Sequence, residues 1–273
     1  AQKLQSLPEP VESQDSEQWQ PLKPLAEHPR TSVNVVEQLR RNHYIRKPVD
    51  DALSSEMFDK FLGMLDSNRS YFLASDIRSF EPLRFKLDDA LKGSDLKPAF
   101  YIFNRYQRRL LERLDYSLSI LEQGVDQFDF SLAESLQIDR EDAEWPADRQ
   151  AQDNLWRQRL KAQILSLRLN DKEDAEISEI LTKRLRNRIK MAKRNKSEDA
   201  FQLYMNAFAS TFDPHTQYFS PRTSENFNIN MSLSLEGIGA VLKSEDDATS
   251  IVRLVPAGPA AKSKAIKPTD KIT

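Results

Sequence analysis

The chain has 273 residues, enough for two domains of ordinary size, and its 40 Lys and Arg are nearly balanced by 42 Asp and Glu. The net charge of −2 gives no reason to expect nucleic acid or an anionic membrane as a partner. The absence of cysteine excludes disulfides and thiol chemistry. No apolar run reaches the roughly 20 residues that a membrane helix needs, and no signal-like segment opens the chain, so we expect a cytosolic protein or one whose signal has been removed.

Residues 1–30 are rich in Gln, Glu, Ser and Pro and show little apolar periodicity, which predicts an extended or disordered leader. From 31 to 212, apolar residues recur at helical spacing and predict an all-helical domain. Thr31 and Ser32 are the expected cap of the first helix, and Ser75 that of the third, in which Pro82 predicts a kink. The expected helices span about 31–43, 49–65, 75–93, 95–124, 148–170, 172–195 and 197–212.

Two stretches break the helical pattern. Residues 65–73 contain a run of turn formers followed by apolar residues, which predicts a connector with a buried anchor. Residues 125–147 are irregular, and we expect their apolar side chains to cover the core: Phe128, Phe130, Trp145 and Pro146.

The remaining residues change character. Pro214 and Pro221 enforce extended or turn geometry in a linker over 213–230, which contains a short helical piece around 225–227. From Met231 to the end of the chain, alternating apolar residues predict strands, with a glycine-bounded loop at 237–239, a short alanine-rich helix to about 266 and a turn at 268–270.

This last stretch, 231–273, resembles the PDZ domain of the C-terminal processing, or tail-specific, serine proteases. The resemblance lies in the loop Leu235-Glu236-Gly237-Ile238-Gly239 and the later run Gly258-Pro259-Ala260-Ala261-Lys262-Ser263, with Asp270-Lys271-Ile272 after it. Asp213-Pro214-His215-Thr216, followed by Ser220-Pro221, also resembles the segment ahead of the PDZ domain in that family. The family usually has glycine where this chain has Thr269, so we expect a strained turn there.

The resemblance, closest to a large periplasmic member from Gram-negative bacteria, implies a mainly α protein with a multi-helix N-terminal domain and the β-rich start of a PDZ domain (α+β). It implies that successive backbone N–H groups of the glycine loop bind a peptide carboxylate while the edge of the next strand pairs with the peptide. We expect Glu236 to turn away from that carboxylate, which it would repel. The expected peptide-binding residues are Leu235, Gly237, Ile238, Gly239, Ala240, Val241 and Leu242.

Members of the family use a serine nucleophile and a lysine base in a domain after the PDZ domain. We therefore expect no catalytic residue, no metal and no cofactor in this segment. Ser94 and Lys97 match the Ser-x-x-Lys spacing, but their position at a helix start predicts a capping turn instead. Asp213 and His215 could form half of a catalytic set, although the more favoured interpretation is that they satisfy backbone groups in their turn.

The basic run over 183–194 has a second interpretation as a nucleic-acid surface. Leu181, Leu185 and Ile189 recur four residues apart along the same segment, so the charges are expected on the solvent face of an amphipathic helix, with docking of an acidic partner as the second choice.

We hypothesise the N-terminal part of a periplasmic endopeptidase, with its signal removed and its location periplasmic or peripheral to the inner membrane. Its implied partners are apolar C-terminal tails of envelope proteins, the remainder of the same protease chain, and a lipoprotein adaptor; the helical domain either frames the substrate cleft or docks that adaptor. No nucleic acid and no transmembrane segment are expected. The alternative is a non-catalytic helical and PDZ binding scaffold. Because no helical pattern follows Ile266 to complete a PDZ groove, we expect the chain to be a truncated part of a longer one.

Overall fold

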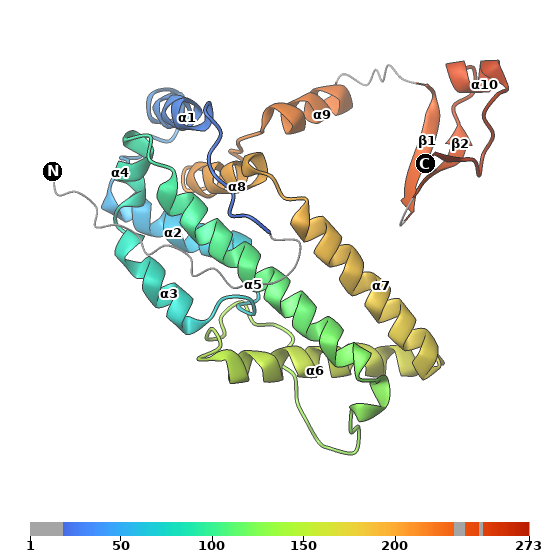
Figure 1. Cartoon of the computed structure of the whole chain (residues 1–273). Coiled ribbons are helices and arrows are strands. Elements are labelled where there is room, and N and C mark those ends of the chain that lie inside the picture. The colour runs from blue at the N-terminus through green and yellow to red at the C-terminus, as the bar shows by residue number, and fades with distance from the viewer. Residues whose placement is uncertain (1–18, 232–237, 246–247, 273) are drawn as a thin grey trace.

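The computed structural model describes residues 19–231, 238–245 and 248–272. A body of helices occupies most of the chain, and a small sheet follows it beyond α9 (Figure 1). This arrangement confirms the mainly α class with a β-containing C-terminal part. The helices of the body are α1 (His28–Asn42), α2 (Asp51–Leu65), α3 (Ala74–Phe80), η1 (Glu81–Leu83), α4 (Leu87–Lys92), α5 (Lys97–Glu122), η2 (Val125–Gln127), α6 (Arg149–Arg168), α7 (Asp174–Lys193), α8 (Ser197–Ala209) and α9 (Pro221–Met231).

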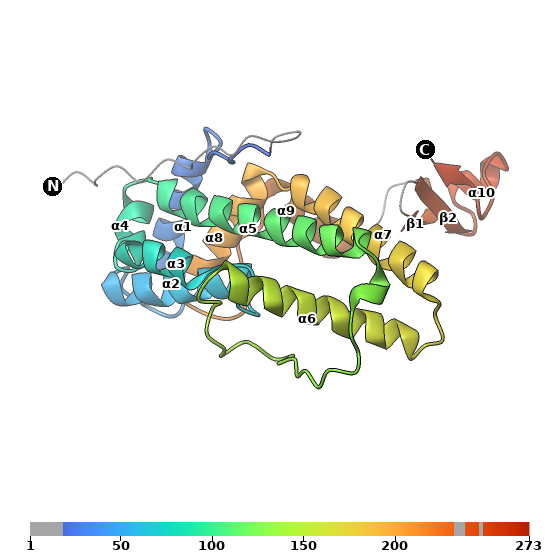
Figure 2. The same cartoon turned by 60° about the horizontal axis from the view of Figure 1, so that its bottom comes forward.

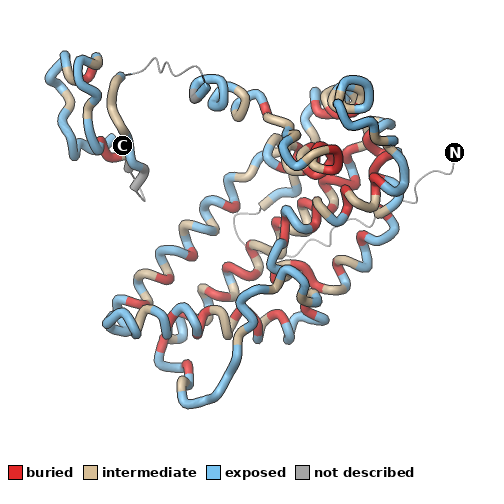
Figure 3. Tube along the Cα trace, turned by 180° about the vertical axis from the view of Figure 1, so that it is seen from behind, coloured by how far each residue is buried: buried red, intermediate tan, exposed pale blue. Residues whose placement is uncertain are grey.

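Helix α5 is the axis of the body: its first half packs beside α8, and its second half lies between α6 and α7 (Figure 2). The first half belongs to an aromatic-rich core shared with α1, α2, α4 and α8, which includes Phe61, Phe103 and Phe208. The second half belongs to an aliphatic core shared with α6 and α7, which includes Leu114 and Ile164. In Figure 3 the buried residues follow these inner faces. The apolar periodicity of the sequence is therefore realised as two adjoining cores along one long helix.

The first helix begins three residues earlier than expected, at His28 rather than Thr31. Pro29 occupies the first turn, where its missing N–H costs nothing. His28 was assigned to the leader but is buried: its ring stacks on Phe201 at 4.1 Å, and its Nε2 lies 2.9 Å from an Oε2 of Glu198. The described residues before it are also held in place, since Asn104 exchanges two 2.9 Å hydrogen bonds with the backbone of Leu22.

The single helix expected over 75–93 is wrong, because the chain breaks into α3, η1 and α4. Pro82 lies in η1, where its ring cannot continue an α-helix. Ser75 is not the cap either. Instead, the carboxylate of Asp76 accepts the backbone N–H of Leu73 at 3.0 Å, which fixes the start of α3.

The connector after α2 does contain the expected buried anchor. One carboxylate organises it: Asp66 accepts the backbone N–H groups of Ser70 at 2.8 Å and of Tyr71 and Phe72 at 3.0 Å each. The Phe72 side chain is fully buried. Trp145, expected as an anchor from the irregular stretch, donates its indole N–H to Asp66 at 3.2 Å.

The sheet consists of β1 (Ala240–Glu245), β2 (Ala248–Leu254) and β3 (Lys271–Ile272) in the order β1-β2-β3, with antiparallel pairing throughout. The short helix α10 (Pro259–Ser263) lies between β2 and β3. The strand expected to begin at Met231 is wrong at that residue, because α9 continues through Met231. The rest of that expected strand falls outside the described residues.

Candidate functional site

The predicted peptide-binding loop is described from Ile238 onward; Leu235, Glu236 and Gly237 lie outside the described residues. Gly239 has a φ of +74°, a conformation that glycine adopts without steric cost. A Cβ added there would lie 3.0 Å from the Cα of Gly258 and 3.4 Å from the Cδ of Pro259. The two glycines thus let the loop and the start of α10 approach each other closely.

Hydrogen bonds hold this approach together. The backbone carbonyl of Gly239 accepts the N–H of Val255 at 2.7 Å, and the carbonyl of Ile238 accepts the N–H of Ala260 at 2.8 Å. The loop carbonyls are therefore engaged on the α10 side, and the glycine loop keeps a defined backbone course into β1.

Strand β1 pairs with β2 on one side and is an edge of the described sheet. The register shifts between Val241 and Leu242, which marks a bulge. The side chains of Ile238 and Leu242 are 48% and 45% exposed, so both offer apolar surface beside the strand edge. A loop with open apolar positions leading into an unpaired edge is an arrangement to which an extended peptide can add as a further strand.

Thr269 has a φ of +79°. This confirms the expected strain, because a β-branched residue rarely adopts that conformation. The turn is held nevertheless by a 2.7 Å bond from the Thr269 N–H to the carbonyl of Ile251. The strained residue lies in the turn between α10 and β3 and is not part of the glycine loop.

The linker pair Asp213 and His215 is part of a polar cluster with His43 and Tyr44, which follow α1. Asp213 accepts the backbone N–H of His215 at 2.6 Å and the hydroxyl of Tyr44, and these bonds lower the pKa of its carboxyl. The imidazole of His215 is exposed. The imidazole of His43 contacts the linker instead, with its Nε2 2.9 Å from the Thr216 hydroxyl. The Asp213 carboxylate thus satisfies a turn, as the favoured interpretation has it.

Ser94 and Lys97 do not share a helix. Ser94 lies in the turn between α4 and α5 with a φ of +60°, and Lys97 is the first residue of α5. The Lys97 N–H donates to the carboxylate of Asp95 at 3.0 Å. The capping-turn interpretation is confirmed.

The basic run on α7 is amphipathic. Leu181 and Leu185 are buried in the aliphatic core, while Lys183, Arg184 and Arg186 are exposed. Within the described part of the chain, no group of three or more His, Cys, Asp or Glu has the arrangement of a metal site. The described helices also include none long and apolar enough to cross a membrane.

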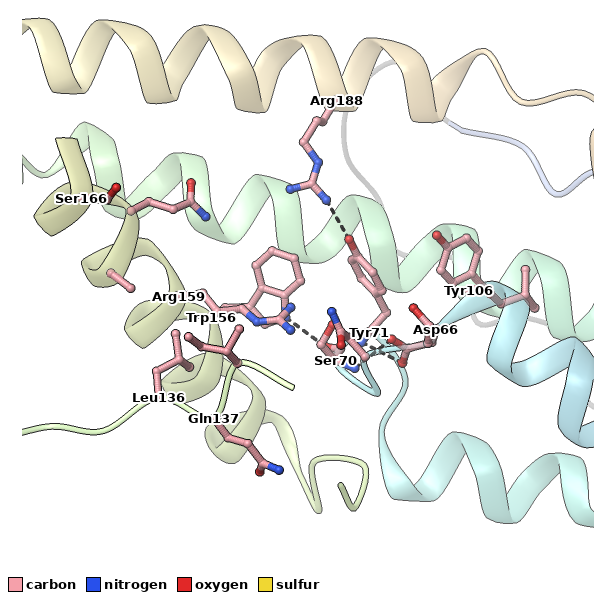
Figure 4. A pocket seen from close by; sticks show the side chains of 16 residues that line it. Asp66, Ser70, Tyr71, Tyr106, Leu136, Gln137, Trp156, Arg159, Ser166 and Arg188 are labelled. Atoms are coloured by element: carbon pink, nitrogen blue, oxygen red, sulfur yellow. Dashed lines mark hydrogen bonds between the residues drawn. The ribbon is translucent and has the colours of Figure 1, made fainter. Parts of the chain in front are cut away.

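Sequence reasoning missed a cleft of about 660 Å³ on the helical body, where the connector after α2 meets α5, α6 and α7 (Figure 4). Tyr71 and Trp156 form part of its wall, and Arg159 and Arg188 reach it from α6 and α7. These residues come from segments about 120 positions apart, so no local pattern in the sequence relates them.

Comparison with known proteins shows which family the chain belongs to. Residues 35–222 match the family model described as "Tail specific protease N-terminal domain". The chain belongs to the tail-specific protease family. It is also 42% identical, over 236 residues, to a "Tail-specific protease" of Haemophilus influenzae. That alignment covers 86% of this chain and 34% of the relative, so the chain spans about a third of the relative's length.

The residues matched by the family model can be assigned to elements of the fold. The family model covers α2 to α8 in full, together with the linker that contains Asp213 and His215. The relative is a longer protease, and this segment corresponds to part of such a chain. The glycine loop and the sheet lie after the residues that the family model matches.

Proposed function

We propose that the chain is the N-terminal part of a periplasmic tail-specific serine endopeptidase. Its C-terminal sheet is the start of a PDZ domain that captures apolar protein C-termini, and its Ser/Lys catalytic pair lies beyond this segment. Membership of the tail-specific protease family supports the protease class. The substrates, on this proposal, are envelope proteins with accessible C-terminal tails.

One observation carries the recognition part of the proposal: the left-handed Gly239, closely packed against Gly258, leads directly into β1, which is an edge strand of the described sheet. Backbone N–H groups of such a loop can bind a terminal carboxylate, since they offer donors without side chains in the way. The strand edge then pairs with the residues before the carboxylate. Ile238 and Leu242 offer exposed apolar surface for the last side chains of the tail.

The functional test uses the parent protease that carries this segment. A protein substrate with an apolar C-terminus should be cleaved, and replacement of Gly239 by valine should reduce kcat/KM, because the valine Cβ would displace Gly258. Gly63→Ala is the matched control: a Cβ at Gly63, in α2, meets nothing within 4 Å. Equal activity of the Gly239 variant and the control would reject the loop as the recognition site.

The second candidate is a non-catalytic scaffold that holds C-termini through the same loop. The same glycine geometry supports binding in either case, so the distinction rests on turnover. A parent chain that binds apolar tails through the loop but leaves the substrate intact would establish the scaffold. Cleavage that depends on Gly239 would establish the protease.

The helical body is proposed to frame the substrate path or to dock a lipoprotein adaptor. Exposed charge on α7 is consistent with a docking role for an acidic partner. An adaptor that binds the parent protease equally well after charge reversal at Arg184 and Arg186 would place its site elsewhere.

A further inference from the structure

The cleft on the helical body has an aromatic wall. Tyr71 packs edge-on against Tyr106, with ring centroids 5.6 Å apart, and lies 5.3 Å from the ring of Trp156 (Figure 4). Leu136 and Ile138, from the irregular stretch between η2 and α6, line the same space. Ile138 is 84% exposed. The cleft therefore offers apolar surface that is open to solvent.

This wall is rigid before any ligand arrives. Asp66 holds the backbone of the connector through three N–H groups, as described above. The indole N–H of Trp156 donates to the carbonyl of Ser70 at 2.9 Å, and the side-chain amide of Gln152 donates to the same carbonyl at 3.2 Å. A ligand would thus lose little free energy in ordering the site.

Two arginines reach the cleft without a carboxylate partner. Arg188 donates to the Tyr71 hydroxyl at 2.8 Å, and Arg159 lies over the Trp156 ring at 5.5 Å. Among the described residues, neither forms an ion pair with an acidic side chain. Asp66 also lines the cleft, but its two oxygens are engaged by backbone amides and by Trp145.

Several other buried or half-buried cations of the same body are paired with a carboxylate. Arg109 binds Asp76, the fully buried Arg113 binds Asp153, and Lys161 binds Glu134. Burial of a cation is costly unless a carboxylate compensates it. Burial lowers the pKa of Arg159 most, and the charges of Arg140 and Arg188 act in the same direction, whereas Tyr71 and Asp66 raise it. The half-buried Arg159 is therefore in an environment that an added anion would stabilise.

We propose that this cleft binds an extended polypeptide segment of a partner protein, with an aspartate or glutamate side chain between Arg159 and Arg188 and a neighbouring apolar side chain on the Tyr71 and Trp156 wall. The two guanidinium groups would bind the carboxylate, and the aromatic rings would pack against the neighbouring apolar side chain. The cleft is open rather than enclosed, so a segment can pass through it, and a chain terminus is not required. The site is separate from the glycine loop and does not depend on the proposed protease activity.

Isothermal titration of the whole chain tests the proposal with two blocked peptides, acetyl-Ala-Leu-Glu-Leu-Ala-amide and its counterpart with glutamine in place of glutamate. We expect the glutamate peptide to bind at least about tenfold more tightly, since a charge-assisted pair with arginine is lost in the other. Its affinity should fall as salt is raised.

Variants locate the site. Arg159→Gln and Arg188→Gln should each weaken binding of the glutamate peptide about tenfold, and Arg159→Lys less, because lysine keeps the charge but not the planar donor pair. Arg78→Gln is the matched control: it removes the same charge from an exposed position on α3 that does not line the cleft and should leave binding unchanged. Far-UV circular dichroism of each variant should show the helical content of the parent chain.

Three results would overturn the proposal. The first is equal affinity for the glutamate and glutamine peptides. The second is an equal loss of affinity in Arg78→Gln and Arg159→Gln, which would indicate attraction by overall charge alone. The third is unchanged affinity in both Arg159→Gln and Arg188→Gln, which would place the bound peptide outside the cleft.

Discussion

The helical body and the C-terminal sheet are stabilised in different ways. The body buries phenylalanines, tyrosines and leucines in two adjoining cores and adds ion pairs in which one partner is buried. In the described part of the sheet and α10, only Ser250, Ile251 and Ala260 are buried, and apolar side chains such as Val252 remain exposed. A small unit with so little buried apolar surface is marginal by itself. The sheet is thus expected to open far more readily than the body.

The two regions also differ in whether they contain a buried, compensated charge or a strained backbone. The body buries the charge of Asp76 and compensates it with Arg105 and Arg109, at 2.7 and 2.8 Å. The sheet has no comparable network among its described residues, and it relies on backbone geometry at Gly239 and Thr269. Three substitutions probe this contrast, from the largest expected effect to the smallest.

Asp76→Asn should destabilise the helical body by about 3 kcal/mol, because it leaves Arg105 and Arg109 without their shared carboxylate. Urea unfolding followed by the helical circular dichroism signal measures this. Burial raises the pKa of Asp76, but the hydrogen bonds from Arg109 and the Leu73 N–H, with the charge of Arg105, outweigh it, so the pKa lies below the ordinary 3.8. The stabilisation is complete above that value and is lost as the pH falls through the lower folded-state pKa.

The loss in Asp76→Asn should therefore be full at pH 7 and should shrink below about pH 4. Glu37→Gln is the control, since Glu37 forms exposed ion pairs with Arg40 and Arg41 on α1 and should change nothing measurable. A pH-independent loss in Asp76→Asn would show that the carboxylate acts through shape alone.

Gly239→Val should destabilise the sheet by about 1–3 kcal/mol, because valine is strained at positive φ and its Cβ would collide with Gly258. The circular dichroism signal of the helices would mask a loss of stability in the sheet, so hydrogen exchange measured by mass spectrometry is the appropriate method. Amides of β2 should exchange about tenfold faster or more. Gly63→Ala should leave β2 unaffected and stabilise α2 by about 0.5–1 kcal/mol. Unchanged exchange in Gly239→Val would mean that the close approach of the two glycines is not required.

Thr269→Gly should stabilise the sheet slightly. It relieves a threonine at a φ of +79° while keeping the backbone bond to Ile251. Because glycine also adds freedom to the unfolded chain, the net gain is about 0.5–1 kcal/mol and should slow exchange in β2 about two- to fivefold. The same change at Thr249, which lies within β2, should instead accelerate exchange. Acceleration in both variants would contradict the assignment of strain to Thr269.

Several elements could be predicted from sequence because their signals are local. The inner faces of α2, α5, α6 and α8 repeat every three to four residues, and the glycines around Ile238 identify a loop. The break at Pro82 between α3 and α4 was underestimated as a kink. The start of α3 was assigned to Ser75 because the role of Asp76 there depends on Arg105 and Arg109, which lie about 30 positions away. The start of α1 was placed too late because the burial of His28 depends on Phe201 and Glu198.

The sequence by itself determined the helical class, the position of most helices, the glycine loop and the family resemblance, because each rests on neighbouring residues along the chain. Only the tertiary structure decided where the long-range partners meet. It placed Gly258 against Gly239, and it placed the carboxylate of Asp66 where it accepts backbone N–H groups of the connector after α2. It also placed Arg159 and Arg188 beside Tyr71, where neither forms an ion pair with an acidic side chain of the described residues. Such contacts depend on how helices cross and pack, and residues far apart in sequence carry no local pattern that could reveal them.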